Sequence, residues 1–484
     1  MFKQRPIASI FFVIVKMEMK TKHRQHKQKV SAVQRQMTAF YKAKQQVRMY
    51  HGESNSTRVS DADRQKTVDV SSLTDILEVN SDERYVLVEP NVPLDALIQA
   101  TIPFGLMPAV VSEFPGITIG GAVQGGAAES SSYAWGCLHE IALEYEVVLG
   151  NGAVVTASNK NHPDLYHGLA CSYGSLGVLT LIKLQLVDAP KFVELAYVPV
   201  KSAAEASRVM TLVAKNKPLF IDAIMFGKEE GVVMIGNKAN DLTLPLARFS
   251  QARDEWFYLH AQNVASKHSN YKERIPLQDY LFRYDRGAFW MGKHGYKLFH
   301  IPFNRFTRYW FSSFMKTRTL YRFLHGAHLS QQFIIQDLCL PKASVQEFVD
   351  YVDSRFGIEP LWLCPLKTDK EAWLAPNYLK SESVINVGLW GAFHGDYDAF
   401  IDTNREIENK VHSLGGRKVL YAHCYYEEAN FWKVYDHERY LAIRKKYKAD
   451  DSLKNIYDKV TVKKKYKASV IKGWMAILKD AGLQ

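Results

Sequence analysis

The chain of 484 residues is long enough for two or three domains, and with 47% hydrophobic and 12% aromatic residues it can bury sizeable cores, which excludes global disorder. Its net charge of +12 is concentrated in two runs, Lys16 to Lys29 and Lys459 to Lys467. Because neither run lies in a recognisable DNA- or RNA-binding module, we expect no nucleic-acid partner.

Cysteine and histidine spacings exclude two further classes of protein. The five cysteines are scattered, odd in number and never in a C-x-x-C pair, which argues for a reducing compartment and against a disulfide framework or a zinc site. The His-Glu pairs at His139 and His437 are not followed by the second histidine of an H-E-x-x-H motif. We therefore expect no metal site.

The N-terminus carries an apolar segment, Ile7 to Val15, ahead of the first basic run. A bilayer-spanning helix needs about 20 apolar residues, so this segment is too short to cross alone. No small-residue cleavage site follows it, as a secretory signal would require. Two interpretations stay open: the segment anchors the protein in one leaflet, or the assumed start of the chain is wrong.

The next elements predict two small subdomains. Helical spacing predicts a helix over Val30 to Tyr50, and a strand is expected at Val86 to Pro90. The segment Pro93 to Ile102 predicts a second helix, because a proline in the first helical turn loses only an N–H that has no partner there. The second subdomain is expected from about Gly105 to Ala189.

The most informative stretch is Phe114 to Ser132, FPGITIGGAVQGGAAESSS, which holds five glycines within eleven residues. Glycine lets a backbone approach a ligand closely and adopt positive φ. The middle of the run is uncharged, unlike a solvated linker, and predicts backbone lying against a large, flat or phosphorylated cofactor. A tight turn between two buried strands is the alternative. Neither a Walker P-loop nor the dinucleotide G-x-G-x-x-G spacing is present.

The remaining pattern alternates strands and helices. Residues 144–189 predict a β-hairpin around Gly150-Asn151-Gly152, a helix beginning at His162, and a small-residue loop, Cys171 to Gly177, before a long β-branched strand. From Val193 to Gly236 the alternation predicts a mixed sheet with helices on one face.

Two glycine-bearing segments, ITIGGAVQGGAAESSSYAWG and DLYHGLACSYGSLGVL, resemble the flavin-binding domain of the vanillyl-alcohol-oxidase/PCMH superfamily. Four later segments, RIPLQDYLFRYDRGAFW, IIQDLCLP, LWLCPL and KVLYAHCYYEEANFW, resemble in the same order the delta-24-sterol reductase family, also called the 24-dehydrocholesterol reductase, Diminuto or seladin family. The similarity runs from roughly Val30 to Lys459. It implies an α+β fold with a PCMH-type two-subdomain FAD-binding domain and a mixed-sheet substrate domain.

We expect four parts along the sequence. They are a short apolar and basic N-terminal tail (1–29), the FAD-binding domain (30–190), a substrate or cap domain with an aromatic and basic insertion (191–440), and a basic helical C-terminal segment (441–484). The insertion, Trp256 to Leu329, allows either a buried helical layer or a lipid-facing patch, and we favour contact with a membrane or a sterol.

The resemblance implies FAD as the cofactor. Covalent attachment in this superfamily usually uses a histidine inside the first phosphate loop, whereas His51 precedes the glycine here, so we expect noncovalent FAD. An ordinary polar loop is the alternative for His51 to Arg58. The expected cofactor-binding residues are Gly52, Ser54, Thr57, Arg58, Ile117, Thr118, Gly120, Gly121, Gly125, Glu129, Ser130, Ser131, Gly174, Gly177 and Val178.

The reaction that the resemblance implies is NADPH-dependent reduction of an isolated double bond in the side chain of a sterol or in a similar isoprenoid alkene. An unconjugated alkene has no carbonyl to hold negative charge, so a proton donor must act at one carbon while reduced flavin delivers hydride to the other. The expected catalytic residues are Asp337, His423 and Tyr425. Strand alternation predicts Tyr421, His423 and Tyr425 on one face, and the family usually has an acid where this protein has His423.

Alternatives stay open for each candidate. Asp337 stands alone in an apolar strand, so it has either a raised pKa or a partner, and a salt bridge to Arg283 or Arg286 is the structural alternative. For His423 the alternative is a satisfied core histidine. The alternative functions are a flavin-dependent alcohol oxidase or dehydrogenase, in which His423 would be a base, and a non-enzymatic flavoprotein-like scaffold or membrane-bound binding protein.

Charge and resemblance together suggest a location. A basic surface near anionic headgroups gains roughly 1 kcal/mol per Lys or Arg, so a membrane surface is an expected partner, with a merely solvated helix as the alternative for the C-terminal run. We expect a protein of the endoplasmic reticulum membrane, or a cytoplasmic protein peripherally associated with a membrane.

Overall fold

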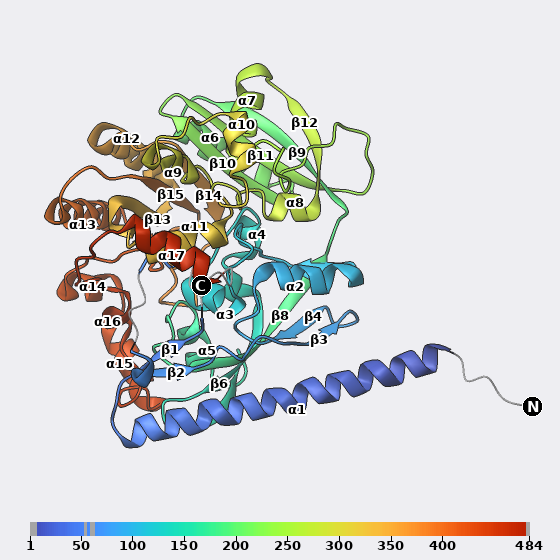
Figure 1. Cartoon of the computed structure of the whole chain (residues 1–484), viewed down its shortest axis with the longest axis vertical. Coiled ribbons are helices and arrows are strands. Elements are labelled where there is room, and N and C mark those ends of the chain that lie inside the picture. The colour runs from blue at the N-terminus through green and yellow to red at the C-terminus, as the bar shows by residue number, and fades with distance from the viewer. Residues whose placement is uncertain (1–6, 53–55, 59–62, 481–484) are drawn as a thin grey trace, which may run out of the picture.

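The computed structural model describes residues 7–52, 56–58 and 63–480. Figure 1 shows a smaller sheet in the lower half of the molecule and a larger one in the upper half, with the long helix α1 (Ile7–Lys42) along the bottom. Both large sheets contribute to one hydrophobic cluster that runs through the middle of the molecule. The expected α+β class is confirmed.

The smaller sheet belongs to the half in which the resemblance predicts FAD binding, here called the FAD-type half. Its strands are, in spatial order, β3 (Ile76–Asn80), β4 (Tyr85–Val88), β8 (Val178–Asp188), β6 (Ala142–Val148) and β7 (Val154–Ala157), with β5 (Leu106–Pro108) also paired to β8. Its helices are α2 (Leu94–Thr101), α3 (Ile119–Gly125), α4 (Ser132–Trp135) and α5 (Pro163–Leu169). The predicted hairpin around Gly150-Asn151-Gly152 is the antiparallel pair β6–β7. A separate parallel pair, β1 (Arg48–Tyr50) and β2 (Thr67–Asp69), lies beside it.

Helix α1 begins earlier than the helix predicted from Val30 and runs without a break through the expected boundary at 29/30. Its buried residues Val30, Val33 and Met37 pack with Val68 and Leu73 in a small cluster of their own. The division into domains remains a prediction. Among the helices that the structure describes, none combines the length and the apolar character needed to span a bilayer.

The larger sheet has eight strands. In spatial order they are β12 (Tyr271–Pro276), β9 (Phe192–Val200), β11 (Glu230–Ala239), β10 (Phe220–Gly227), β14 (Leu361–Leu366), β15 (Val384–Ala392), β13 (Phe333–Pro341) and β16 (Arg417–Lys418). The helices α6 (Ala203–Ala214), α12 (Val345–Phe356) and α13 (Tyr397–Ser413) share a hydrophobic cluster with one face of this sheet. The opposite face looks toward the FAD-type half.

Every pairing in the larger sheet is antiparallel, so the expectation of a mixed sheet is wrong on this point. Strand β11 lies between β9 and β10, and β15 lies between β13 and β14. Each strand–helix–strand unit therefore has its two parallel strands separated by a third, antiparallel strand. The alternation of strands and helices along the sequence indicates the crossover connection. It does not indicate that another strand lies between the two strands that the crossover connects.

The remaining helices lie between and beside the two halves. They are α7 (Phe257–Lys267), α8 (Leu277–Leu281), α9 (Gly292–Leu298), α10 (Arg305–Trp310), α11 (Thr317–Gly326), α14 (Glu428–Val434), α15 (His437–Lys446), α16 (Ile456–Val460) and α17 (Val470–Asp480). The C-terminal part returns to the FAD-type half, where Val47 forms a β-bridge with Leu453 and Arg444 donates to the Ser175 carbonyl at 2.6 Å. It therefore packs as part of the fold.

Candidate active site

A cavity of about 500 Å³ lies between the two halves. Its walls come from the loop after β1, the glycine segment and α3, helices α9 and α11, the inner face of β13 and β15, and the loop at Val419 and Tyr421. A volume of this size is typical of small-molecule sites. The cavity thus joins the predicted flavin segment to the predicted catalytic strand.

The structure brings eight of the predicted cofactor residues to the cavity. They are Gly52, Arg58, Ile117, Thr118, Gly120, Gly121, Gly125 and Val178. The others lie elsewhere or outside the described residues, as in the case of Ser54. Thr57 is buried and its backbone N–H donates to the Tyr421 carbonyl at 3.3 Å.

The predicted residues Glu129, Ser130 and Ser131 are buried and do not line the cavity. Their side chains bond within the protein. Ser130 Oγ donates to Glu129 Oε2 at 2.6 Å, and Ser131 Oγ donates to the Ala109 carbonyl at 2.7 Å. Two predicted glycines also serve packing, because a Cβ on Gly177 would lie 2.5 Å from Val147 and one on Gly174 would lie 1.9 Å from Met49.

The glycines of α3 have two different roles. Thr118 caps the helix by accepting the Gly121 N–H at 3.3 Å. A Cβ on Gly120 would lie 2.5 Å from the Pro90 Cβ, so Gly120 allows α3 to approach the segment after β4. Nothing lies within 4 Å of the Cβ position of Gly125, whose backbone borders the open cavity. Gly125 therefore leaves room where a ligand would lie.

Three cations line one end of the cavity. They are Arg48, Arg58 and Lys459. Arg58 donates to the Leu420 and Ala422 carbonyls and lies over the Tyr173 ring at 5.6 Å. Burial lowers the pKa of Lys459 well below its usual range, and its neighbours Arg48 and Arg58 lower it further. A cluster of buried positive charges fits an anionic ligand group such as a pyrophosphate.

The cavity wall also holds buried polar atoms that lack hydrogen-bond partners among the described residues: Ser112 Oγ, Glu113 Oε1 and Gln124 Nε2. Burial raises the pKa of Glu113 well above its usual range, and the nearby Glu129 carboxylate adds to the effect. Buried polar atoms are nearly always paired in native proteins. Together with the cations, they fit a large ligand with polar edges and a phosphate group, and thus FAD.

Asp337 on β13 and Tyr421 both line the cavity. The Tyr421 hydroxyl donates to Asp337 Oδ2 at 2.7 Å, and Asn386 Nδ2 donates to Asp337 Oδ1 at 2.7 Å. Burial raises the pKa of Asp337 to about 6, against the opposing effect of these two hydrogen bonds. The carboxyl group can therefore exchange a proton near neutral pH.

The alternative partners of Asp337 are engaged elsewhere. Arg283 pairs with Asp222 at 2.8 Å, and Arg286 donates to backbone carbonyls, including that of Phe249 at 3.0 Å. The salt-bridge interpretation of Asp337 is therefore wrong. Its raised pKa comes from burial beside neutral donors.

His423 and Tyr425 do not line the cavity, and the predicted strand through them is not formed, since β16 ends at Lys418. Their ring centroids lie 6.0 Å apart, and both rings contact the Phe400 ring of α13. Burial lowers the pKa of His423 to about 3, and nearby cations add to the effect. Without a strand, alternation does not apply, and His423 resembles the satisfied core histidine of the alternative interpretation.

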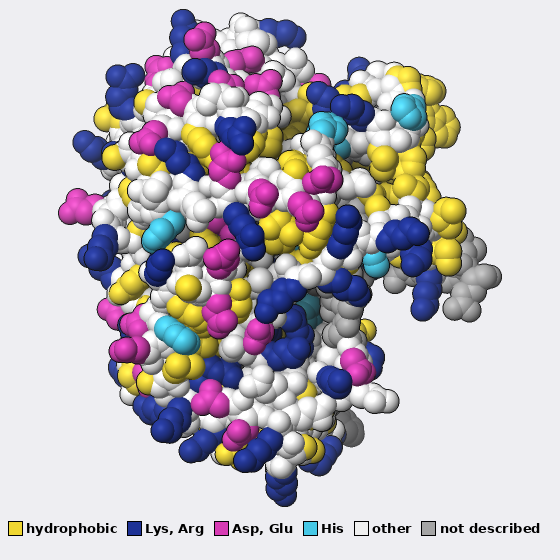
Figure 2. All heavy atoms as spheres, turned by 90° about the vertical axis from the view of Figure 1, so that its left-hand side faces the viewer, with side chains coloured by type: hydrophobic (Ala, Val, Ile, Leu, Met, Phe, Trp, Pro, Cys, Tyr) yellow, Lys and Arg dark blue, Asp and Glu magenta, His cyan; other side chains and the backbone are white. Residues whose placement is uncertain are grey.

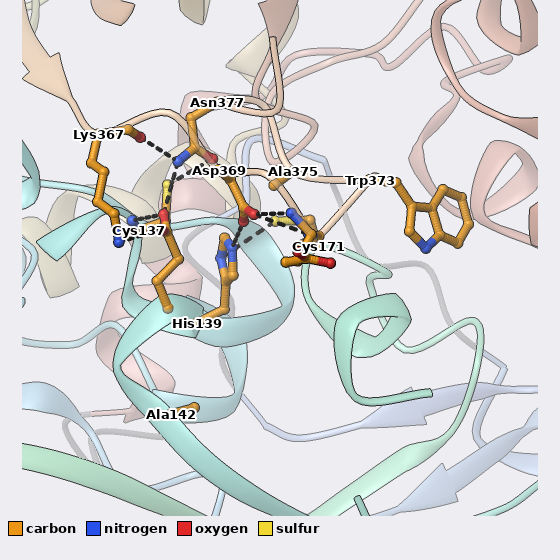
Figure 3. A network of polar contacts seen from close by, with 12 residues as sticks. Cys137, His139, Ala142, Cys171, Lys367, Asp369, Trp373, Ala375 and Asn377 are labelled. Atoms are coloured by element: carbon orange, nitrogen blue, oxygen red, sulfur yellow. Dashed lines mark hydrogen bonds and ion pairs between the residues drawn. The ribbon is translucent and has the colours of Figure 1, made fainter. Parts of the chain in front are cut away.

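A polar network joins the two halves, and Figure 3 shows His139 and Cys171 beside Asp369 and Asn377. His139 Nε2 lies 2.8 Å from Asp369 Oδ2, Cys171 Sγ lies 3.8 Å from His139 Nδ1, and Asn377 Nδ2 donates to Glu140 Oε1 at 2.9 Å. Ligand-type atoms of His139, Glu140 and Asp369 lie within 4.8 Å of one another, but each already has a protein partner. We assign this network a structural role.

Sequence reasoning missed several lining residues. Lys459 belongs to a basic run that predicts a solvated or membrane-facing surface, yet the residue is only 9% exposed. Tyr173 stands beside a predicted glycine, and Asn386 lies on a strand with no distinguishing motif. Asn386 could be recognised only from the pairing of β13 with β15, which brings it close to Asp337. Strand pairing cannot be read from a single sequence.

Comparison with known proteins agrees with this site. Residues 27–158 match the family model described as an FAD binding domain. The Delta(24)-sterol reductases of Macaca fascicularis and Homo sapiens are each 27% identical to this protein over 451 residues, covering 90% of its length and 86% of theirs. The Arabidopsis thaliana Delta(24)-sterol reductase is 27% identical over 460 residues, covering 86% of this protein and 80% of its own length.

The fold and the matched domain define an FAD-dependent oxidoreductase with a PCMH-type FAD-binding domain. The predicted relationship is confirmed. The protein is a homologue of the Delta(24)-sterol reductases within the FAD-binding superfamily.

Proposed function

We propose that this protein is a reductase that uses NADPH and noncovalently bound FAD to saturate an isolated double bond in the side chain of a sterol. The names of the relatives support the substrate class. The observation that carries the proposal is the Asp337–Tyr421 pair, which borders the same cavity as the glycine segment. Bound FAD would supply the hydride, and the protein's own residues supply the binding, the dry pocket and the proton.

Two groups of residues would bind the cofactor. The positive end formed by Arg48, Arg58 and Lys459 would hold the pyrophosphate, and the backbone at Gly121 and Gly125 would allow close approach of the rings. We further propose that the attachment is noncovalent, because His51 precedes the loop glycine. Acid precipitation of the protein would leave FAD in the supernatant if this is right.

Proton delivery falls to Asp337 acting with Tyr421. An alkene carbon needs a proton as hydride reaches its neighbour, and a donor works best when its pKa is near the working pH. Protonation of Asp337 would reverse the hydrogen bond, so that the carboxyl O–H donates to the Tyr421 oxygen and the Tyr421 hydroxyl turns to the substrate. Tyr421 would then give its proton to the alkene carbon and take the Asp337 proton in its place. Trp362, Trp390 and Phe289 line the adjacent wall and would exclude water from the sterol side chain.

The oxidase or dehydrogenase alternative relied on His423 as a base. No observation favours it, because His423 is buried among Phe400 and Tyr425 and does not line the cavity. We also propose that the protein works at a membrane, of the endoplasmic reticulum or at its cytoplasmic surface, since a sterol is a membrane lipid.

Product analysis tests the proposal. The purified FAD-loaded protein is incubated with NADPH and a sterol that has a double bond in its side chain, and the product is identified by mass spectrometry. We expect a product heavier by the mass of two hydrogens, formed only when NADPH is present. A product oxidised at a hydroxyl, or no conversion by protein that retains its flavin, would contradict the proposal.

A further inference from the structure

We propose that an exposed aromatic surface on α9, α10, α17 and the segment between α10 and α11 binds a bilayer of anionic lipids and holds the mouth of the cavity against it. This aromatic surface consists of Leu298, Phe306, Tyr309, Trp310, Phe314, Ile471, Trp474, Met475 and Leu478. The attachment of this surface to lipid follows from its exposure and charge, whereas its role in admitting substrate rests on the proposed function.

These side chains are too exposed to serve mainly in packing the interior of the protein. On α10, Phe306 is 69% exposed and Trp310 is 65% exposed. On α17, Ile471 is 74% exposed and Met475 is 60% exposed. Each pair is spaced by four residues and so shares one helix face. Contiguous exposed apolar side chains of this size mark an interaction site.

Helix α17 is held firmly by its other face. A Cβ on Gly473 would lie 2.7 Å from the Phe323 ring and 2.8 Å from Ala327, so the helix packs closely on α11. The Trp474 ring lies 5.5 Å from that of Phe323 and 5.8 Å from that of Phe314. The outward apolar face of α17 is therefore a fixed feature of the fold.

The charge around the aromatic surface selects the partner. Residues 291–329 contain seven Lys or Arg and no Asp or Glu, and residues 460–479 contain six Lys and no Asp or Glu. Figure 2 shows hydrophobic side chains gathered along its right-hand edge with Lys and Arg side chains among them. Apolar groups within a basic rim match an anionic bilayer, into which helices of this kind bury their apolar face. A second copy of the protein would bring the same positive charge to the contact.

The aromatic surface is continuous with the cavity. Leu298 is 41% exposed and also lines the cavity, together with His294 and Gly295 of α9. Phe323 of α11 lines the cavity and contacts Trp474. An apolar ligand would thus pass from the bilayer into the cavity along apolar side chains.

Vesicle binding of the full-length, FAD-loaded protein tests the proposal. Binding is measured to vesicles of phosphatidylcholine alone and to vesicles with about 30% phosphatidylserine, without substrate or NADPH. We expect tight binding to the anionic vesicles and at least tenfold weaker binding for F306S/W310S and for I471S/M475S. The matched control L212S/L242S replaces side chains that are 62% and 56% exposed outside the aromatic surface, and it should bind like the wild type.

Charge variants complete the test. K293Q/K297Q should weaken binding to the anionic vesicles only, and K215Q/K217Q should not. An unchanged flavin spectrum verifies that each variant is folded. Because residues 7–15 offer a second attachment, only differences among variants count. Wild-type affinity in both aromatic variants would overturn the proposal, as would a wild-type dimer in light scattering that F306S/W310S dissociates. Either result leaves the proposed reductase activity untouched.

Discussion

Tyr421 donates its hydroxyl hydrogen to Asp337 across 2.7 Å, in the wall of the cavity that the glycine segment also borders. The pair comes from residues 84 positions apart. It places an acid with a pKa of about 6 behind a phenol that faces the ligand space. We regard this pair as the centre of the proposed chemistry.

The first prediction concerns Asp337→Asn. Removing the acid should lower the rate of alkene reduction by about 100-fold or more, because a positioned proton donor contributes 10²–10⁴-fold. FAD content and flavin reduction by NADPH should stay near wild type. Asn386→Asp is the comparison that adds a carboxyl beside the same site. Equal rates of alkene reduction in Asp337→Asn and wild type would contradict the role of Asp337.

The second prediction concerns pH. The proton-donating form of Asp337 is present below its pKa of about 6 and is lost as the pH rises through that value. The alkene-reduction rate, measured with pre-reduced flavin, should therefore fall about tenfold per pH unit above about pH 6. Tyr421→Phe should lower the rate at every pH. A flat profile between pH 5 and pH 8 would count against the pair.

The third prediction concerns Lys459→Met. Lys459 is a buried cation with no acidic partner among the described residues and so destabilises the protein without FAD, which means that the substitution should raise the melting temperature of the FAD-free protein. The same substitution should weaken FAD binding by about tenfold or more, because a charge-assisted contact is lost. Fluorescence titration and thermal unfolding measure the two effects. Lys467→Met, in the same basic run but exposed, is the control and should change neither.

The fourth prediction separates two glycines of α3. Gly120→Ala should destabilise the protein by about 1–3 kcal/mol, because its Cβ would overlap Pro90. Gly125→Ala should leave stability unchanged or slightly raised, since alanine favours helix, but should weaken FAD binding because it adds a methyl group at a residue that borders the cavity. Chemical denaturation and FAD titration of both variants provide the measurement. The reverse pattern would show that the cofactor lies elsewhere.

The fifth prediction concerns His26, which joins α1 to the FAD-type half. His26 Nδ1 lies 2.8 Å from Glu89 Oε1, and His26 Nε2 lies 3.0 Å from Glu146 Oε1. Burial by itself lowers the pKa of His26, but hydrogen bonds to Glu146 and Glu89 outweigh it and raise the pKa to about 9. The stabilisation is complete below pH 6.5 and is lost as the pH rises through about 9.

The shift in pKa corresponds to about 3 kcal/mol. Solvent screening of the partly exposed Glu146 reduces this, so thermal unfolding between pH 6 and pH 10 should show a loss of about 2 kcal/mol in the wild type. His26→Gln should show a smaller loss over the same range. If the two proteins lose stability in parallel, the ion pairs of His26 do not hold α1.

The sequence predicted the fold class and the glycine segment because both depend on local patterns. Glycine spacing identified Gly120, Gly121 and Gly125, and apolar context identified Asp337 as a buried acid. Which glycine packs and which faces a ligand could not be predicted, because that depends on Pro90 and on an open cavity built from distant segments.

The catalytic partners were harder to predict for the same reason. Strand alternation predicts His423 and Tyr425 beside Tyr421, but alternation does not apply where the backbone leaves the sheet after Lys418. Alternation predicts Tyr421 and His423 on one face, yet Tyr421 contacts Asp337 in the cavity wall whereas His423 packs against Phe400 and does not line the cavity. Lys459 was hidden in a basic run because sequence alone does not show which one of several lysines is buried.

The measurement that tests the central claim most directly is the visible spectrum of the purified protein under anaerobic conditions. We predict a flavin spectrum that NADPH bleaches and that a sterol with a double bond in its side chain restores, with no restoration by the saturated sterol. A flavin that NADPH leaves oxidised and that an alcohol bleaches, or a bleached flavin that the sterol alkene does not reoxidise, would contradict the account.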